Sequence, residues 1–287
     1  MINSEHKPNV EGQAGILPMQ CCAKPFWNHS DLIEIYNESN LDTMARMPDN
    51  CIDLTVTSPP YDNLREYKGY SFEFEEVAKE LYRITKPGGV VVWVVGDATV
   101  DGSETLTSFR QALFFNAIGF NIETMIYKKI AIAARGSKYL YEQSFEYMFL
   151  LSNGDIKTSN LLRDKRNAYY GCSTRPKKMN KDGTKTDEGL RVIPEFSKRH
   201  NVWEYGGGDK EDLGHPAVFP EQLAADHIKS WSNEGDLVYE PFGGSGTTAK
   251  MAYLLNRRCI MSEISKEYCE LSVKRLTPYV QQQRLFA

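Results

Sequence analysis

No apolar stretch in this 287-residue sequence approaches the roughly 18 residues that a membrane-spanning helix needs. The N-terminus also lacks the continuous apolar segment of a secretory signal peptide. These two absences predict a cytoplasmic protein that has no membrane partner.

Cysteine and histidine are scarce, at six and five residues. No Cys-x-x-Cys pair occurs, the adjacent Cys21 and Cys22 are poorly placed for a bridge, and the histidines do not cluster with the cysteines. Reduced thiols are therefore expected, and no zinc or other metal site is predicted.

The chain as a whole has no excess of positive charge. Its 34 Lys and Arg residues and 38 Asp and Glu residues give a net charge of −4. The hydrophobic content of 41% and charged content of 25% are typical of one large α/β domain with an insertion, or of two smaller domains. The charge is uneven, since residues 157–200 hold 12 basic and 5 acidic residues, a balance of 12 − 5 = +7. This segment is predicted either to meet an anionic partner or to form a solvated, disordered loop.

Apolar runs alternate with helical patterns at both ends of the chain, which predicts an α/β fold with a doubly wound sheet. The run Val90–Val95 is typical of a central parallel strand that is covered on both faces. Phe74–Ile84 has helical spacing and is followed by Lys86–Gly89, which predicts the end of a helix. Further strands are expected at Ile33–Tyr36, Ile52–Val56, Phe120–Lys128, Ser144–Leu151, Leu237–Tyr239 and Cys259–Met261, and further helices at residues 104–118, Pro220–Trp231, Thr247–Asn256 and Lys266–Leu276.

A glycine-rich turn, Gly243–Gly246, follows one predicted strand but lacks the Lys-Ser/Thr ending of a P-loop and the spacing of a dinucleotide motif. Its glycines allow backbone amides to approach a small charged ligand. Glu263 lies 263 − 243 = 20 residues beyond Gly243, at the end of the next strand, where an acid can bind two ribose hydroxyls. The alternatives are a purely structural turn and a solvated acid at a helix start.

The run Ser58–Tyr61, Ser-Pro-Pro-Tyr, follows another predicted strand. The two prolines remove backbone donors, so the carbonyl of Pro59 and the oxygen of Ser58 can accept the hydrogens of a base amine. Tyr61 could stack on that base if the base left the helix. The alternative is a strand-end turn with a buried tyrosine.

These two motifs, in this order, make residues 31–278 resemble the β-class amino-methyltransferases of DNA. The Ser form of the first motif is typical of enzymes that methylate the cytosine amine, and the Asp form of adenine enzymes. The resemblance implies a Rossmann-like, seven-stranded sheet, mostly parallel with an antiparallel strand, and S-adenosylmethionine as the cofactor. It assigns catalysis to Ser58, Pro59, Pro60 and Tyr61.

The same resemblance implies a cofactor site and a DNA-binding segment. Cofactor binding is expected at Glu240, Pro241, Phe242, Gly243, Gly244, Ser245, Gly246, Thr247 and Glu263, and at His215, Pro216 and Phe219. The strand Ser144–Leu151 resembles the one that helps to hold a flipped base. Phosphate contacts are expected from Arg163, Lys165, Arg166, Arg175, Lys177 and Lys178. Tyr169 and Tyr170 could stack or wedge.

The chain is accordingly divided into an N-terminal arm (1–30), a catalytic half (31–156), a target-recognition insertion (157–205) and a cofactor-binding half (206–287). Its expected partner is duplex DNA, and a homodimer and a cognate restriction endonuclease are further partners that the sequence allows.

Three features depart from the family pattern or leave a role open. Glu240 stands where the family often has Asp, and Asn37–Asn40 replaces a Gly-Asp pair that meets the cofactor adenine. Asp97 is either an acid of the site or a strand-end cap. The Pro-Cys dipeptide of carbon-methylating cytosine enzymes is missing, so direct in-line transfer is expected.

The sequence predicts site-specific methylation of the cytosine amine by base flipping. Adenine methylation, methylation of RNA or of a protein amide, and a catalytically idle DNA-binding module are the alternatives.

Overall fold

The computed structural model describes residues 24–30, 32–60, 73–130, 139, 141–206 and 220–283. Tyr61, His215, Pro216 and Phe219, which were predicted to lie in the site, fall outside these described residues.

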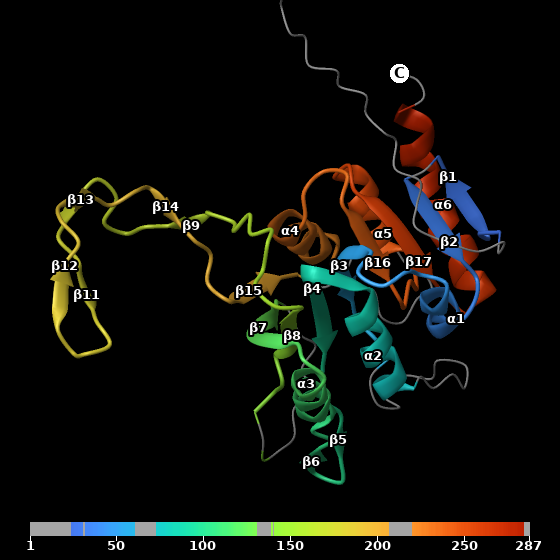
Figure 1. Cartoon of the computed structure of the whole chain (residues 1–287), viewed down its shortest axis with the longest axis horizontal. Helices are drawn as coiled ribbons and strands as arrows, with labels where there is room; N and C mark the ends of the chain where they lie inside the picture. Colours follow the sequence, from blue (N-terminus) through green and yellow to red (C-terminus); the bar gives the residue numbers. More distant parts are fainter. Residues whose placement is uncertain are drawn as a thin grey trace, which may run out of the picture.

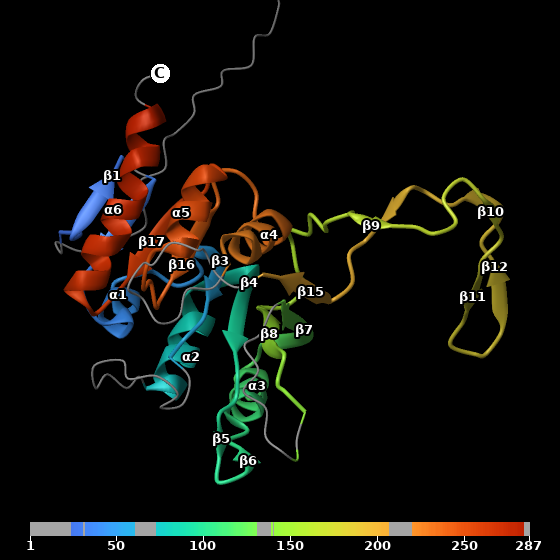
Figure 2. The ribbon, with the colours of Figure 1, turned by 180° about the vertical axis from the view of Figure 1, so that it is seen from behind.

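The described residues form a large mixed sheet with helices on both faces (Figures 1 and 2). The helices are α1 (Asn40–Ala45), α2 (Phe74–Ile84), α3 (Thr107–Ala117), α4 (Glu221–Trp231), α5 (Thr247–Leu254) and α6 (Lys266–Gln283). The strands of the sheet are β1 (Trp27–His29), β2 (Ile33–Tyr36), β3 (Ile52–Thr57), β4 (Thr85–Val95), β7 (Asn121–Lys129), β8 (Phe145–Ser152), β15 (Val202–Tyr205), β16 (Leu237–Glu240) and β17 (Arg258–Ser262). None of the helices within the described ranges is both long enough and apolar enough to cross a bilayer.

The strand order is β1-β2-β17-β16-β3-β4-β8-β7-β15. Strands β2, β17, β16, β3 and β4 pair in parallel, whereas β8 is antiparallel to both of its neighbours. The predicted architecture is therefore confirmed. The described part of the chain has nine strands in this sheet where seven were predicted, because β1 pairs antiparallel with β2 and β15 pairs parallel with β7 at the two edges.

Alternation along each central strand sends side chains to two separate cores. In β4, Val90, Val92 and Val94 face a core with α4, α5 and α6, and Trp93 faces a second core with α1, α2 and α3. The whole run Val90–Val95 is buried, as expected of a strand covered on both faces.

Helix α2 has the predicted bounds, because its apolar positions recur on one face and are buried at Val77, Ala78, Leu81 and Ile84. The hydroxyl of Thr85 donates to the carbonyl oxygen of Leu81 at 2.6 Å, where the helix ends. The helix ends before Lys86–Gly89 as predicted, and this segment belongs to strand β4, which begins at Thr85.

Other boundaries differ modestly. The helix expected over residues 104–118 is α3, preceded by a small hairpin of β5 (Thr99–Val100) and β6 (Ser103–Glu104). The last helix, expected to end at Leu276, continues to Gln283 with Pro278 inside it. Strand β1 lies within the predicted N-terminal arm.

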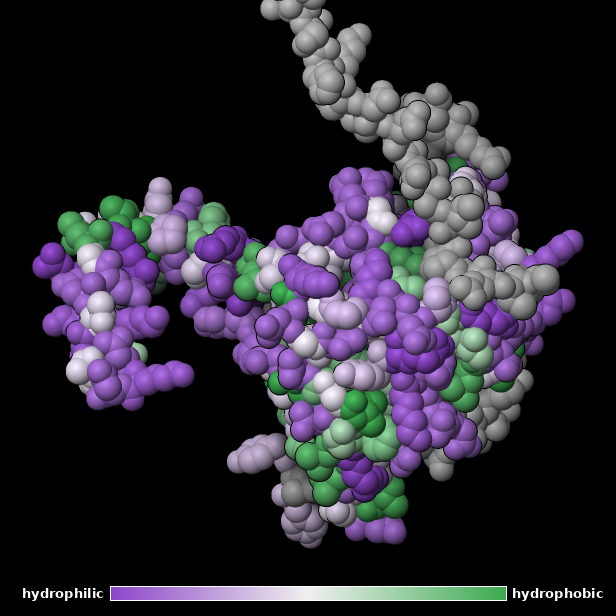
Figure 3. Space-filling model, in the orientation of Figure 1, coloured by the Kyte–Doolittle hydropathy of each residue, from purple (hydrophilic) through white to green (hydrophobic). Residues whose placement is uncertain are grey.

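Residues 157–200, the basic arm, leave the body as a long excursion and return at β15 (Figures 1 and 2). Instead of a structureless loop, the basic arm contains three short antiparallel pairings. They join β9 (Lys165–Arg166) to β14 (Phe196–Ser197), β10 (Ser173–Thr174) to β13 (Arg191–Val192), and β11 (Lys177–Met179) to β12 (Lys185–Asp187). Figure 3 shows a mostly hydrophilic surface along it, with apolar side chains at its distal bend.

Candidate functional site

The carboxyl ends of five parallel strands meet along one edge of the sheet. From β2 to β4 the order of the strands places Asn37, Glu263, the glycine turn, Ser58 and Asp97 along this edge, each beginning within three residues of the end of its strand. Ligands of open α/β sheets bind at this kind of edge. The two predicted motifs therefore follow adjacent strands, β3 and β16, although they are far apart in the sequence.

The catalytic motif begins at the end of β3. Thr57 is the last residue of that strand and is fully buried, whereas Ser58 is only partly buried. Pro59 is buried and Pro60 is partly buried. Ser58 therefore lies where the buried strand reaches the open edge.

The glycine turn is held by backbone contacts. Gly243 N donates to Ser262 O at 2.9 Å, and Gly246 N donates to Gly243 O at 2.8 Å. A Cβ atom on Gly243 would lie 2.4 Å from Met261 Cγ, and Gly246 has φ +75° with Ser272 close by. Both positions therefore require glycine, one for close packing and the other for backbone conformation.

Ser245 and Thr247, two predicted cofactor residues, are 4% exposed. The guanidinium of Arg275 donates to Ser245 O at 2.8 Å and to Thr247 Oγ1 at 3.2 Å. Phe242 contacts the ring of Trp93 edge to face, with centroids 6.2 Å apart. These side chains brace the turn from the protein side.

Glu240 connects the two motifs. Its carboxyl is 2% exposed and lies within hydrogen-bond distance of three donor groups, Thr57 Oγ1 at 2.5 Å, Phe242 N at 3.0 Å and Thr248 Oγ1 at 2.8 Å. Burial outweighs these three donors and raises the pKa of Glu240 from 4.5 to about 8. Glu240 is therefore largely protonated at neutral pH.

The hydroxyl of Thr248 supports this protonation state. Its single proton has two acceptors within reach, Val56 O at 3.1 Å and Glu240 Oε2 at 2.8 Å. A protonated Glu240 can donate to Thr248 Oγ1 while Thr248 donates to Val56 O, so both short contacts become hydrogen bonds. A neutral acid thus ties β3, β16 and α5 together.

Glu263 follows β17 beside the glycine turn, as predicted. Its carboxylate accepts hydrogen bonds from Gly244 N at 2.7 Å and Ser265 N at 2.8 Å, and burial raises its pKa. It is thus a partly buried acid that contacts the turn, rather than a solvated acid at a helix start. A carboxylate can accept from the hydroxyls of a ribose, and the backbone amides of a glycine turn can donate to a charged group, so the two together suit a ligand that has both.

Two asparagines of the Asn37–Asn40 stretch, to which the sequence assigned no role of their own, support this edge. Asn37 Nδ2 donates to Glu263 O and to Ile264 O, both at 3.0 Å, and Asn40 Nδ2 donates to Pro241 O at 3.2 Å. The sequence signal for these two asparagines is their place: both follow closely after a predicted strand of the sheet that carries the glycine turn.

Glu38, in the same stretch, accepts a hydrogen bond from Thr43 Oγ1 at 2.7 Å and forms an ion pair with Arg46. The carboxylate of Glu38 is therefore already engaged by Thr43 and Arg46.

Asp97, the other acid considered from the sequence, is 6% exposed and accepts hydrogen bonds from Ser108 N at 2.9 Å and Ser108 Oγ at 2.5 Å. It thus accepts from the first turn of α3, which differs from the strand-end cap that the sequence offered as the alternative.

The six predicted phosphate contacts are distributed along the basic arm and all are exposed. They are Arg163, Lys165, Arg166, Arg175, Lys177 and Lys178. Tyr169 and Tyr170 are 73% and 59% exposed. Acidic partners lie 3.8 Å from Arg166 (Glu195) and 3.4 Å from Arg175 (Asp187), distances that leave these pairs loose and solvated.

Within the described residues, Cys51, Cys172, Cys259 and Cys269 are free thiols. No three His, Cys, Asp or Glu side chains in that part of the chain gather as a metal site.

A DNA methylase family model, N6_N4_Mtase, matches residues 52–274 of this chain. The chain is 56% identical over 244 residues to the orphan methyltransferase M.BamHII of Bacillus amyloliquefaciens, covering 81% of this chain and 91% of that protein. It is 29% identical over 266 residues to the type II methyltransferase M.BglII of Bacillus subtilis, covering 86% and 69% of the two chains.

Two solved structures share the fold. The PvuII DNA methyltransferase (cytosine-N4-specific) matches with a TM-score of 0.65 and 19% identity, covering 90% of this chain and 94% of that one. The complex of M1.HpyAVI with SAM matches with a TM-score of 0.60 and 20% identity, covering 85% and 99%.

The fold, the edge with its two motifs and the family match define an amino-methyltransferase of nucleic acid bases. The chain belongs to the N6_N4_Mtase family of DNA methylases, and its cofactor is S-adenosylmethionine, as the sequence predicted.

Proposed function

We propose that this protein methylates the exocyclic amine of cytosine at a specific sequence in duplex DNA, with the target base flipped out of the helix. The observation that carries the proposal is the hydrogen bond from Thr57 to Glu240 at 2.5 Å. It links Thr57, the residue before Ser58, to Glu240, the last residue of the strand that leads into the glycine turn. A base amine at Ser58 and a methyl donor at the turn would then be neighbours.

The Ser58 form of the motif supports cytosine. The amine of cytosine is a poor nucleophile because its lone pair is delocalised into the ring. Acceptors at Ser58 Oγ and the Pro59 carbonyl would hold both amine hydrogens and favour a pyramidal nitrogen with an available lone pair. The fold shared with the PvuII enzyme, which is named as cytosine-N4-specific, agrees with this choice.

The cofactor would lie along the glycine turn, with Glu263 on its ribose hydroxyls and the amides near Gly244 toward its charged end. When bound, it supplies a methyl group on a sulfonium centre that is electrophilic enough for direct transfer. Gly243 and Gly246 let the turn pack closely on Met261 and Ser272, and Phe242 closes the side next to Trp93. The protein then contributes mainly by orienting the amine and excluding water.

Base flipping follows from the geometry of duplex DNA, because the cytosine amine is engaged in base pairing and cannot reach a strand edge. The basic arm, with a balance of +7, provides the charge for phosphate contacts that position the duplex. A homodimer and a cognate restriction endonuclease stay predictions from the sequence.

The test is the identity of the methylated nucleoside. The protein and its Ser58→Ala variant are expressed in a host without other methyltransferases, and the genomic DNA is digested to nucleosides and analysed by mass spectrometry. We expect N4-methyldeoxycytidine with the native chain and very little with the variant. N6-methyldeoxyadenosine would reassign the base, and unmodified DNA would refute the proposal.

A further inference from the structure

The basic arm has no core of its own. Its six strands are two or three residues long, and apolar side chains along it remain open to solvent, including Met179 at 66%, Leu190 at 71% and Val192 at 62% exposed. Since little apolar surface is buried within it, the direction in which it points must be set where it joins the body.

The length of the basic arm makes that junction important. Gly183, in its outermost turn, is 199 − 183 = 16 residues from Arg199 at its base. At about 3.3 Å per residue, this corresponds to as much as about 50 Å of chain. A rotation of about 10° at the base would then move the tip by up to about 9 Å, more than the spacing of two base pairs, which is about 3.4 Å each.

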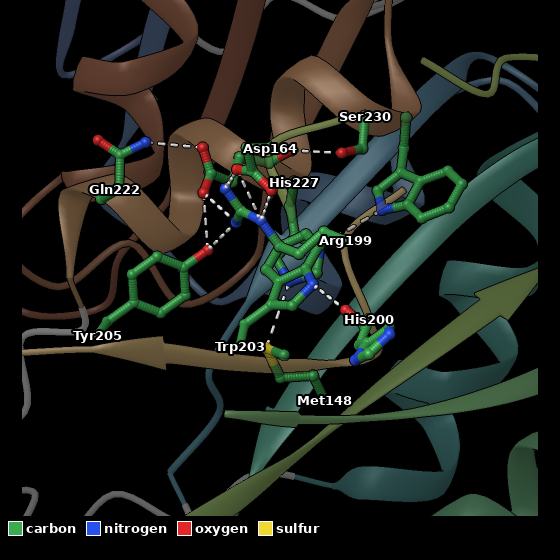
Figure 4. Close-up of polar contacts among 11 residues, drawn as sticks. Met148, Asp164, Arg199, His200, Trp203, Tyr205, Gln222, His227 and Ser230 are labelled. Atoms are coloured by element: carbon green, nitrogen blue, oxygen red, sulfur yellow. Dashed lines mark hydrogen bonds and ion pairs between the residues drawn. The ribbon is translucent and has the colours of Figure 1, made fainter. Parts of the chain in front are cut away.

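Arg199 lies at this base and contacts both sides of it (Figure 4). Its Nε donates to the carboxylate of Asp164 at 3.0 and 3.1 Å, on the outgoing strand of the basic arm. Its Nη1 donates to Asp226 Oδ2 at 2.6 Å, on helix α4. One guanidinium therefore joins the two strands of the basic arm and ties both to the body.

Asp226 is a rigid anchor because it is 3% exposed and fully engaged. Tyr205 Oη donates to its Oδ2 at 2.7 Å, and Gln222 Nε2 donates to its Oδ1 at 2.6 Å. The guanidinium of Arg199 also lies 5.0 Å above the ring of Trp203, which stacks on the buried ring of His227 with centroids 4.5 Å apart. Figure 4 shows Arg199 enclosed among these side chains.

Helix α4 also leads to the cofactor turn. Glu221, in its first turn, accepts hydrogen bonds from Arg275 at 2.7 Å and Lys250 at 2.5 Å. Arg275 in turn donates to Ser245 O in the glycine turn. The base of the basic arm is therefore held at Asp226, in the middle of α4, and the cofactor turn is held through Glu221, at the start of the same helix.

We propose that Arg199 is a positioning residue that locks the basic arm onto α4 and so presents it to DNA in a fixed direction. This inference rests on the proposed function, because it assumes that the basic arm contacts duplex DNA. Arg199 is not a phosphate contact: its positive charge lies between two carboxylates, and the three groups together carry −1. Ordering the basic arm before binding lowers the entropic cost of binding DNA.

The test compares three variants with the native chain. Arg199→Ala removes the lock but leaves the carboxylate of Asp226 buried without a counter-charge, which could unfold the protein. The double variant Arg199→Ala/Asp226→Asn removes the lock and that charge together, so it is the decisive one. Arg166→Ala is the matched control, because it removes an exposed arginine of the same segment.

The first readout needs no DNA. Cys172 lies on the basic arm and is exposed, whereas the other described cysteines are buried. With Cys21 and Cys22 replaced by serine, a fluorescent label on Cys172 reports the motion of the basic arm by time-resolved anisotropy. We expect the native basic arm to tumble with the whole protein, and the double variant of Arg199 and Asp226 to show an added nanosecond component. An unchanged decay would overturn the proposal.

The second readout uses a duplex that carries the site found by mapping methylated bases. For the double variant, we expect KM for DNA to rise by about tenfold while kcat changes less than about twofold. The salt dependence of DNA binding should stay the same, whereas Arg166→Ala should reduce its slope by about 1. A reduced slope in the double variant would identify Arg199 as a phosphate contact and refute the lock. If no DNA is methylated, the proposed function fails, but the anisotropy result still decides whether Arg199 fixes the basic arm.

Discussion

Thr57 and Glu240, 183 residues apart in the sequence, are joined by a hydrogen bond of 2.5 Å between their side chains. Thr57 ends the strand before Ser58, and Glu240 ends the strand before the glycine turn. One buried carboxyl group therefore supports the relative position of the two motifs, in addition to the backbone pairing of β3 with β16. Where the family often has Asp, the longer side chain of Glu240 reaches across to the neighbouring strand.

We expect Glu240→Ala to destabilise the protein strongly. Thr57 and the amide of Phe242 would each lose their acceptor, Thr248 would lose one of its two partners, and an unsatisfied buried polar group costs about 1–3 kcal/mol. A total loss of about 3 kcal/mol would lower the melting temperature by about 6–12 °C, measurable by calorimetry. Glu234→Ala, which changes an exposed acid nearby, should alter the melting temperature by less than about 2 °C. Equal effects of the two changes would contradict this account.

Glu240→Gln should instead be tolerated at neutral pH, because the amide reproduces a protonated acid. Its oxygen can accept from Thr57 and Phe242, and its NH2 group can donate to Thr248. We expect a change in the free energy of unfolding of less than about 1 kcal/mol by urea denaturation. A loss as large as that of Glu240→Ala would show that the native carboxyl is charged.

The stability of the native chain should fall as pH rises, relative to that of Glu240→Gln. The pKa of Glu240 rises from 4.5 in the unfolded chain to about 8 in the folded one, so the folded state binds more protons between these values. The contribution is fully present below about pH 4.5 and is lost as pH increases through about 8. Urea denaturation of both proteins at about pH 5 and about pH 8 measures the difference. Parallel curves for the two proteins would refute the raised pKa.

Glu263→Gln should weaken binding of S-adenosylmethionine by about tenfold or more, because a charged acceptor for the ribose hydroxyls becomes neutral. The amide oxygen of the variant can still accept from Gly244 N, so the turn should persist. Isothermal titration with the cofactor measures the change, and Glu270→Gln, an exposed acid on α6, is the control. Equal affinities of the two variants would place the ribose elsewhere.

The sequence predicted the central sheet well because its signals are local. The valine run of β4 and the helical spacing of Phe74–Ile84 depend only on neighbouring residues, and both elements are present as expected. The position of Glu263 beside the turn followed from the length of one strand-helix-strand unit, and the structure places it there.

Long-range partners were not predictable in this way. Nothing near Glu240 in the sequence indicates Thr57, and nothing near Asp226 indicates Arg199, because these contacts depend on which strands become neighbours. The basic arm was predicted without strands since its pairings are two or three residues long and have no apolar face to create a periodic pattern.

The central claim is that two distant motifs form the two halves of one site, with the base amine at Ser58 and the methyl donor at the glycine turn. The most direct measurement compares turnover and cofactor affinity for Ser58→Ala. We predict a loss of turnover of about a hundredfold or more, with the Kd for S-adenosylmethionine changed less than about twofold. Native turnover in this variant, or an equal loss of cofactor affinity, would contradict the claim.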